Sequence, residues 1–283
     1  NNLKITIQQA LEAPDKVASQ HFFYTLYQKH PYAHPVNGEL DTLKTITRKD
    51  IQQFHDTLFV DQNAILVLVG ALSIQDAKML AENLTRTLPK GPEAPSIPQA
   101  KPHQHAEAVN IPFPSTQTVV RLGQLGINHH NPNYFPLLVG NYTLGGGALV
   151  SQLATELREK RGLTYGVQSQ FVPMPARGPF VIGFATQNTQ AKMAENLTRE
   201  TLDQFIQAGP SDAELQATKQ FLMGSFPLAI ASNQDMASIL LKMAFYHLPD
   251  DYLATYTDKI AAVTKQQILS AFKQAIDPEQ LIQ

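Results

Sequence analysis

The 283-residue sequence contains no cysteine. This absence excludes disulfide bonds and metal sites built on thiolates, and it is compatible with the cytoplasm as well as with an oxidising compartment. No uninterrupted apolar stretch approaches the ~20 residues that a membrane-spanning helix requires, and the first residues lack a charged segment followed by an apolar run. We therefore expect a soluble chain whose compartment the composition leaves open.

The sequence also has little net charge, with 22 Lys and Arg against 24 Asp and Glu and a formal charge of −2. This balance gives no indication of the basic surface typical of nucleic-acid-binding proteins, and we expect no nucleic-acid partner. Hydrophobic residues make up 43% of the chain, which is sufficient for ordinary cores. A chain of this length is more typical of two domains than of one.

Prolines divide the sequence into two parts. Between residues 88 and 102 there are five prolines with little apolar content, at positions 89, 92, 95, 98 and 102. Such a composition is typical of an interdomain linker. We therefore predict that residues 1–88 belong to a first domain, that residues 89–103 are the linker, and that residues 104–283 form a second domain.

The predicted secondary structure indicates an α+β fold. Before the linker, Thr47 and Asp50 have the spacing of a capping box at a helix start, and residues 65–70 are an aliphatic run suited to a strand buried on both faces. Beyond the linker the expected elements are, in order, a strand at 119–127, a helix at 132–144, hairpin strands at 165–172 and 179–186, and several helices over 189–275. Strands followed by helices predict a sandwich of an antiparallel-rich sheet and a helical layer.

The two ends of the sequence resemble each other at a spacing of 217 residues. Without a gap, this spacing aligns Ile46 with Val263, Thr47 with Thr264, Ile51 with Ile268, Gln62 with Glu279 and Ile65 with Ile282. An internal repeat of this kind predicts duplicated domains. The first copy then lacks a counterpart of residues 104–217, so we expect the first domain to be incomplete and the chain to be part of a longer protein.

Residues 145–165 combine three glycines, a helix and the start of a strand. Leucines recur every four positions, as one face of a helix requires, at 149, 153 and 157. Gly162 supplies a helix stop and Tyr165 begins the next strand. The predicted corner therefore carries two hydrogen-bond donors, Arg158 on the last helical turn and Tyr165 on the strand, which together could hold a peptide carbonyl or a carboxylate.

Three places in the sequence resemble the M16 peptidase family, the group of insulinase, pitrilysin and the mitochondrial processing peptidase. They are His30-Pro31-Tyr32 with Gly38 and residues 43–47, the segment 63–70, and above all residues 144–165. The resemblance covers nearly the whole chain. It implies duplicated α+β sandwich domains, in agreement with the repeat.

The sequence lacks the zinc motif of that family. Its zinc peptidases bind metal through an inverted His-x-x-Glu-His motif and a more distant glutamate, and the motif occurs nowhere in this chain. His30 and His34 have the spacing of two ligands on a helix, but Pro31 and Pro35 break the helix that would present them. The other paired histidines, which we also expect in loops, are His103, His105, His129 and His130. We predict no metal ligand in this chain, and the resemblance places zinc in a partner subunit or in a missing segment.

The resemblance also assigns roles to Arg158 and Tyr165. In the zinc peptidases of the family, a matching Arg and Tyr complete the site by donating hydrogen bonds to carbonyl oxygens at or beside the scissile bond. The family pattern places the distant glutamate near residues 5–8, where this sequence has no acidic residue. This departure favours the non-catalytic type of subunit.

The leading hypothesis is a subunit without zinc that supplies Arg158 and Tyr165 for peptide binding and transition-state stabilisation to a zinc-bearing partner, in a homo- or heterodimer. One alternative is a portion of an active zinc peptidase whose metal motif lies in the missing part. Another is a scaffold or assembly protein of the same fold. Related bacterial proteins are often exported, so the resemblance favours the periplasm or another exported location.

Overall fold

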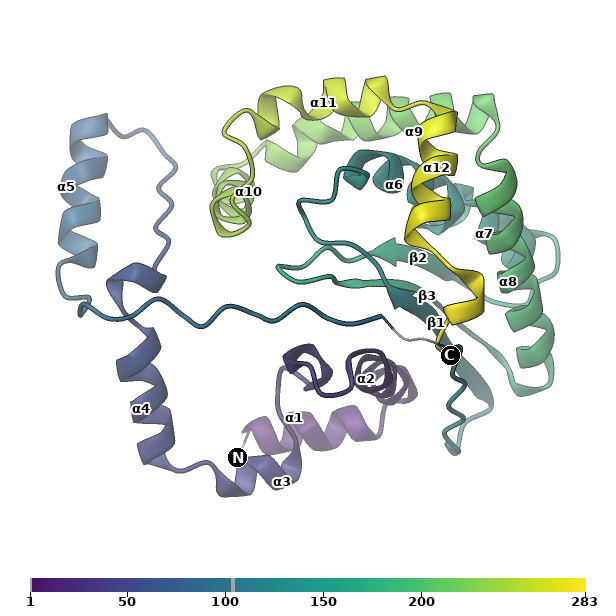
Figure 1. Cartoon of the computed structure of the whole chain (residues 1–283), viewed down its shortest axis with the longest axis horizontal. Coiled ribbons are helices and arrows are strands. Elements are labelled where there is room, and N and C mark those ends of the chain that lie inside the picture. Colours follow the sequence, from purple (N-terminus) through teal and green to yellow (C-terminus); the bar gives the residue numbers. More distant parts are fainter. Residues whose placement is uncertain (1, 103–104) are drawn as a thin grey trace. The chain divides into compact units, whose positions relative to one another are not determined.

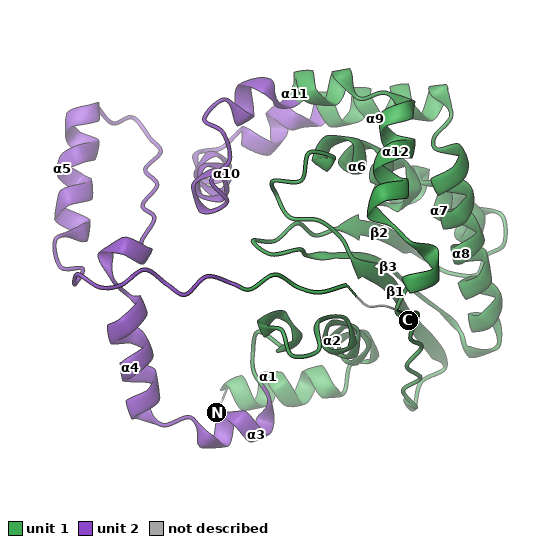
Figure 2. Cartoon of the chain, viewed as in Figure 1, with its two compact units in different colours: residues 1–38, 98–223, 257–283 green, residues 39–97, 224–256 purple. Residues whose placement is uncertain are grey.

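The computed structural model describes residues 2–102 and 105–283, which group into two compact units (Figures 1 and 2). Unit 1 comprises Asn1–Gly38, Pro98–Met223 and Thr257–Gln283, and unit 2 comprises Glu39–Ile97 and Gly224–Tyr256. These units reflect packing rather than order along the chain. The domain boundaries expected from the prolines, 1–88, 89–103 and 104–283, stay a prediction.

A three-stranded antiparallel sheet forms the centre of unit 1. Its strands are β1 (Gln117–Leu125), β2 (Val167–Phe171) and β3 (Pro179–Gln187), and their order is β1-β3-β2. The predicted strands at 119–127, 165–172 and 179–186 are confirmed to within two residues at each end. Because successive side chains of a strand point to opposite faces, each strand divides its residues between the two sides of the sheet.

One face of the sheet carries the core of unit 1. The helices that pack over it are α6 (Tyr134–Asn141), α8 (Ala191–Ala208) and α12 (Lys265–Ala275) (Figure 1). Fully buried side chains from strands and helices meet here, among them Leu122, Phe180, Ile182, Phe205 and Phe272. Burying such apolar side chains contributes about 1.5–3 kcal/mol each relative to exposure. This arrangement confirms the predicted α+β class with an antiparallel sheet and a helical layer.

The opposite face of the sheet is partly covered by α2 (Pro14–Tyr27), which follows α1 (Asn2–Leu11). Phe22 of α2 lies against Gly123 of β1, where an added Cβ would come within 3.0 Å of the ring. The Tyr27 hydroxyl donates to the carbonyl of Arg177 at 3.0 Å, and Arg177 Nε donates to the carbonyl of Gly126 at 2.8 Å. Helix α2 is therefore tied to the connection between β2 and β3.

Short helical turns connect α6 to β2. They are the π-helical turn η3 (Tyr142–Gly146), the 3-10 turn η4 (Ala148–Val150), the short helix α7 (Gln152–Ala154) and the π-helical turn η5 (Thr155–Glu159). The remaining elements are η1 (Pro31–Ala33), η6 (Asn188–Gln190), α9 (Asp212–Ser225), α11 (Tyr252–Ala262) and η8 (Pro278–Gln280).

All the regular secondary structure described in unit 2 is helical. Its elements are α3 (Leu40–Thr45), α4 (Arg48–Leu58), η2 (Asp61–Asn63), α5 (Ile74–Thr85), η7 (Phe226–Ile230) and α10 (Asn233–Phe245). The capping box predicted at the start of α4 is confirmed, since Asp50 N–H donates to Thr47 Oγ1 at 3.3 Å and Thr47 N–H donates to Asp50 Oδ2 at 2.7 Å.

The strand predicted at residues 65–70 is wrong for this structure. The segment has no strand assignment, and Ile65 and Leu66 are each 43% exposed rather than buried. A strand exists only where a neighbour supplies backbone donors and acceptors, and none of the strands in the described residues pairs with this segment.

The internal repeat is present in the local structure. Helices α4 and α12 each have 11 residues and a capping box, and each is followed by a three-residue 3-10 turn, η2 or η8, with all four elements in register at the spacing of 217 residues. The equivalent side chains differ in burial, because Ile268 is 0% exposed in α12 whereas Ile51 is 63% exposed in α4. The repeat therefore preserves the helix and its cap but not its surroundings.

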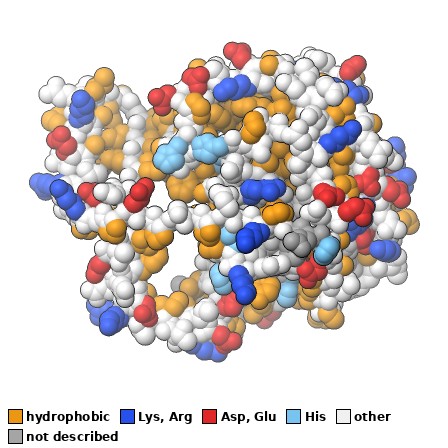
Figure 3. All heavy atoms as spheres, in the orientation of Figure 1, with side chains coloured by type: hydrophobic (Ala, Val, Ile, Leu, Met, Phe, Trp, Pro, Cys, Tyr) orange, Lys and Arg blue, Asp and Glu red, His pale blue; other side chains and the backbone are white. Residues whose placement is uncertain are grey.

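Charged side chains of both signs lie on the face that Figure 3 draws. On the face that Figure 3 draws, Lys and Arg are interspersed with Asp and Glu, and neither sign gathers into a separate patch. Among the helices of the described residues, none combines the length and apolar character needed to cross a membrane.

Gly140 gives a test of the packing between α6 and α12. A Cβ at this position would come within 2.6 Å of the Phe272 ring and 2.7 Å of Ile268 Cγ2, and both neighbours are fully buried. Because neither side chain has free space to move into, we expect Gly140→Ala to lower the free energy of unfolding by about 1–3 kcal/mol, measured by urea denaturation.

The matched control is Gly224→Ala in α9, where an added Cβ meets nothing within 4 Å. Removing a helical glycine there should leave stability unchanged or raise it by up to ~1 kcal/mol. Equal effects of the two substitutions would contradict the packing described between α6 and α12.

Candidate functional site

The glycine run 145–147 allows the chain to pass close to β2. A Cβ on Gly145 would come within 2.4 Å of Ser169 Oγ, and a Cβ on Gly147 within 2.9 Å of the Tyr142 ring. The Asn141 side chain makes two hydrogen bonds to Ser169 of β2. Its Oδ1 accepts from Ser169 Oγ at 2.8 Å, and its Nδ2 donates to Ser169 O at 2.9 Å. The glycines therefore meet a packing requirement of this turn.

The helix that carries Arg158 begins later than the leucine spacing predicts. Ser151 is its N-cap and accepts a backbone N–H of α7 at 3.3 Å. Leu153 and Leu157 are fully buried, as predicted, but Leu149 is 53% exposed. The prediction is wrong for Leu149 because the separate turn η4 precedes the cap, so this residue does not continue the helical face.

The predicted helix stop at Gly162 is confirmed. Gly162 has a left-handed backbone with φ of 61°, a conformation that favours glycine. Its N–H donates to the carbonyl of Arg158 at 2.9 Å, and Leu163 N–H donates to the carbonyl of Leu157 at 2.8 Å. These bonds close η5, whose wide π-helical turn is of a kind often found at functional sites.

Two buried threonines then fix the corner to β3. The Thr186 hydroxyl donates to the carbonyl of Leu163 at 2.6 Å, and the Thr164 hydroxyl donates to the carbonyl of Ala185 at 2.7 Å. Thr164 is 8% exposed and Thr186 is 2% exposed. The segment on the N-terminal side of Tyr165 is thus held by one side-chain hydrogen bond from β3 and by one that it donates to β3.

Arg158 and Tyr165 are the uncommitted donors of this corner. Tyr165 is 88% exposed, and the Arg158 side chain is half-buried on η5. Within the described residues neither side chain makes a hydrogen bond or an ion pair. Neither residue lines the cavities of about 380 and 400 Å³ found in unit 1. An acceptor for either donor would therefore have to come from outside the described residues.

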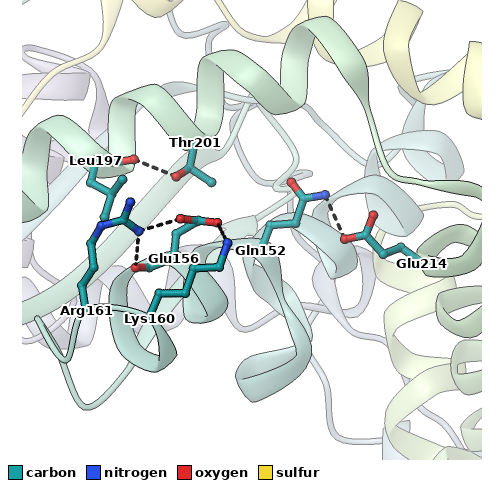
Figure 4. A network of polar contacts seen from close by, with 7 residues as sticks. All are labelled: Gln152, Glu156, Lys160, Arg161, Leu197, Thr201 and Glu214. Atoms are coloured by element: carbon teal, nitrogen blue, oxygen red, sulfur yellow. Dashed lines mark hydrogen bonds and ion pairs between the residues drawn. The ribbon is translucent and has the colours of Figure 1, made fainter.

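The other cations of the same helical end are engaged (Figure 4). Glu156 Oε1 lies 2.6 Å from Lys160 Nζ, and Glu156 Oε2 lies 2.6 Å from Arg161 Nη1. The hydrogen bonds from Lys160 and Arg161 hold the pKa of the Glu156 carboxyl below its ordinary value. On the same helix, Gln152 donates to Glu214 of α9 at 3.0 Å. Among the described residues, Arg158 is therefore the arginine of this helical end that has no ion pair.

Several described histidines occupy loop positions or make local contacts, whereas His21 lies exposed within α2. His30 Nδ1 accepts Tyr32 N–H at 3.1 Å, so its Nε2 carries the proton and donates to the carbonyl of Pro98 at 2.8 Å. His34 follows the turn η1, and the position of His103 lies outside the described residues. In residues 2–102 and 105–283, no three His, Asp or Glu side chains come together in a way that could hold a metal ion.

Comparison with known sequences identifies related proteins. Residues 45–222 match the family described as "Peptidase M16 inactive domain". The chain is 24% identical over 227 residues to the Bacillus subtilis protein named "Uncharacterized zinc protease YmxG", an alignment that covers 80% of this chain and 54% of the relative. It is also 24% identical over 248 residues to the "Non-peptidase homolog YmxG" of Helicobacter pylori, covering 86% and 56% respectively. The chain thus spans about half the length of these curated relatives.

Solved structures share the fold. A Pseudomonas fluorescens structure described as a peptidase M16 inactive domain superimposes with a TM-score of 0.94 at 35% identity, covering 100% of this chain and 67% of that one. A protease from Helicobacter pylori superimposes with a TM-score of 0.89 at 20% identity, covering 99% and 68%. At that lower identity the likeness concerns the fold alone.

Glu156 gives a test of the electrostatics of the corner. A carboxylate whose folded-state pKa lies below the ordinary 4.5 contributes stability that is complete above pH 4.5. That contribution is lost as the pH falls further, through the lowered pKa. The partners Lys160 and Arg161 are 57% and 43% exposed, so solvent screens both pairs. We expect Glu156→Gln to lower the free energy of unfolding at pH 7 by about 1 kcal/mol or less, with the difference from the unmodified chain narrowing below pH 4.5.

The matched control is Glu159→Gln. Glu159 is exposed on the same turn and has no ion pair within the described residues. Urea denaturation at several pH values measures both variants. A deficit of Glu156→Gln that stays constant as the pH falls below 4.5 would contradict the assignment.

Proposed function

Since the chain belongs to the peptidase M16 family, whose inactive-domain description matches most of it, we propose that it supplies Arg158 and Tyr165 to a peptidase site that it completes together with zinc-bearing residues outside this chain. It would bind the peptide and stabilise the transition state without carrying the metal. The observation that supports this proposal is the presence of two free donors on one corner whose backbone is fixed and whose other cations are engaged.

The chemistry of the two donors suits peptide cleavage. As a peptide carbonyl is attacked, negative charge develops on its oxygen, and donors held in position stabilise that charge without reorganising. Arg158 is permanently protonated and offers several N–H groups in one plane, whereas Tyr165 offers a single hydroxyl on a rigid ring. Thr164 and Thr186 already hold the backbone beside Tyr165, so binding would have to order only the side chain of this tyrosine.

Zinc belongs to a partner subunit or a segment outside this chain under this proposal, because the described residues provide no set of ligands for it. The peptide substrate would then lie between the two parts, in a homo- or heterodimer or within a longer chain. The names of the relatives, an uncharacterised zinc protease in Bacillus subtilis and a non-peptidase homolog in Helicobacter pylori, support different alternatives, an active zinc peptidase and a scaffold protein respectively.

Removing either donor tests the proposal. In a complex of the whole protein with a zinc-bearing M16 subunit from the same organism, we expect Arg158→Ala and Tyr165→Phe each to lower the hydrolysis of a quenched fluorescent peptide by about 100-fold or more, as for the loss of one oxyanion donor. The effect should fall mainly on kcat, because a donor that acts on developing charge stabilises the transition state more than the bound substrate.

Arg161→Ala is the matched control, since Glu156 already engages this arginine at 2.6 Å. It should change turnover by less than about threefold, the upper range for an exposed ion pair lying beside a site. Unchanged turnover in both Arg158→Ala and Tyr165→Phe, with the complex intact, would sink the proposal and favour a scaffold role.

A further inference from the structure

A second cavity, lined by both apolar and polar side chains, lies on the open face of the sheet in unit 1. Its volume is about 400 Å³, its floor is formed by all three strands, and its wall is formed by α2. The polar and charged residues that line it are Asp15, Ser19, Arg121, Gln168 and Gln170. Arg121 is the one cation in this lining, so the character of the cavity depends on where its guanidinium lies.

The register of the sheet places the guanidinium over the central strand. Arg121 of β1 pairs with Gly183 of β3, and Gln168 of β2 pairs with the same Gly183, so these three residues form one row across the sheet. Gly183 has no side chain in this row, and a Cβ there would come within 2.9 Å of Arg121 Nη1. Because Gly183 has no side chain, the guanidinium of Arg121 has room to lie across β3, in the direction of Gln168 on β2.

The guanidinium is positioned by the protein but not neutralised by it. Arg121 Nε donates to Ser19 Oγ at 3.1 Å, and Nη1 donates to the carbonyl of Val120 at 3.2 Å. Within the described residues it has no ion pair closer than 4.0 Å. Asp15 attracts it through space, but the Asp15 carboxylate lies 3.8 Å from Lys16 Nζ. Burial lowers the pKa of Arg121, but an arginine guanidinium does not lose its proton in proteins, so the group stays charged.

We propose that this cavity is a subsite for a peptide carboxylate, which Arg121 binds through its guanidinium while Gln168 and Gln170 donate from β2. A planar guanidinium pairs with a carboxylate through two parallel hydrogen bonds. A single arginine, with Asp15 nearby, suits one negative charge better than the two of a phosphate group. The rings of Phe22 and Phe23 in the same wall offer apolar contact to the methylene groups of the ligand.

The subsite deepens the proposed function, on which it rests for the identity of the ligand as a peptide. Gln168 and Gln170 are the exposed residues of β2, the strand that begins two residues after Tyr165. A peptide held at the corner of Arg158 and Tyr165 and extended along β2 would bring a residue several positions away to Arg121. The carboxylate can come from an acidic side chain or from the C-terminus of the peptide.

Binding of three fluorescein-labelled peptides to the chain, measured by anisotropy, tests the subsite. One peptide carries an internal Glu and an amidated C-terminus, the second is neutral with a free C-terminal carboxylate, and the third is neutral and amidated. We expect the first or the second to bind about 10- to 100-fold more tightly than the third, the range for a hydrogen bond to a charged group. The peptide that gains affinity identifies the source of the carboxylate.

Arg121→Gln should abolish that preference. Gly183→Ala should reduce it as well, because the added methyl displaces the guanidinium while leaving every charge in place, which covers the case in which Arg121→Gln fails to fold. Asp15→Asn should act in the opposite direction and tighten the acidic peptide by about two- to fivefold, the size expected for an exposed charge. Arg161→Gln, which removes a cation already held by Glu156, should leave the preference as it is.

The same binding measurements distinguish a failure of the carboxylate subsite from a failure of the proposed function. Arg158→Ala should weaken all three peptides alike and preserve their ratio. Equal binding of the three peptides by the unmodified chain, or a preference that survives Arg121→Gln, would overturn the subsite. If the preference instead disappeared only with Arg158→Ala, the corner would bind the carboxylate, and the proposed function would stand without the subsite.

Discussion

The candidate site depends on two hydrogen bonds, from the hydroxyls of Thr186 and Thr164 to the carbonyls of Leu163 and Ala185. They join the corner after η5 to the central strand β3, so the most constrained part of the sheet sets the position of the corner. Tyr165 can therefore stay 88% exposed without becoming loose, because its backbone is held by its neighbours. The backbone of the site is thus fixed in advance, and the side-chain rotamer of Tyr165 is what a ligand would have to order.

The sheet serves two purposes with its two faces. Its covered face carries the large apolar side chains, such as Phe180 and Ile182, that make the core. Its open face carries small residues at Gly123 and Gly183, over which Phe22 and Arg121 lie. Alternation along the strands makes this division possible, since a residue can be changed on one face without altering the packing on the other.

The sequence predicted the parts of the structure that depend on local rules. The capping box at Thr47, the stop at Gly162 and the three strands follow from spacing and residue type, and they are confirmed. Leu149 and residues 65–70 depend instead on what lies beside them, which periodicity does not contain. Arg121 had one signal, since it is the one charged residue of β1, but only the register that aligns it with Gly183 and Gln168 reveals a cavity.

The repeated helices α4 and α12 share the same local helix signals but differ in how far the rest of the structure buries them. Both begin at a threonine capping box and both have 11 residues. The local sequence signals that start and end the helix are therefore present in both copies. Only α12 buries its apolar face, and most of a short helix's stability comes from such burial. Local opening should therefore cost far less free energy in α4 than in α12, so a protease should cleave within α4 more readily than within α12.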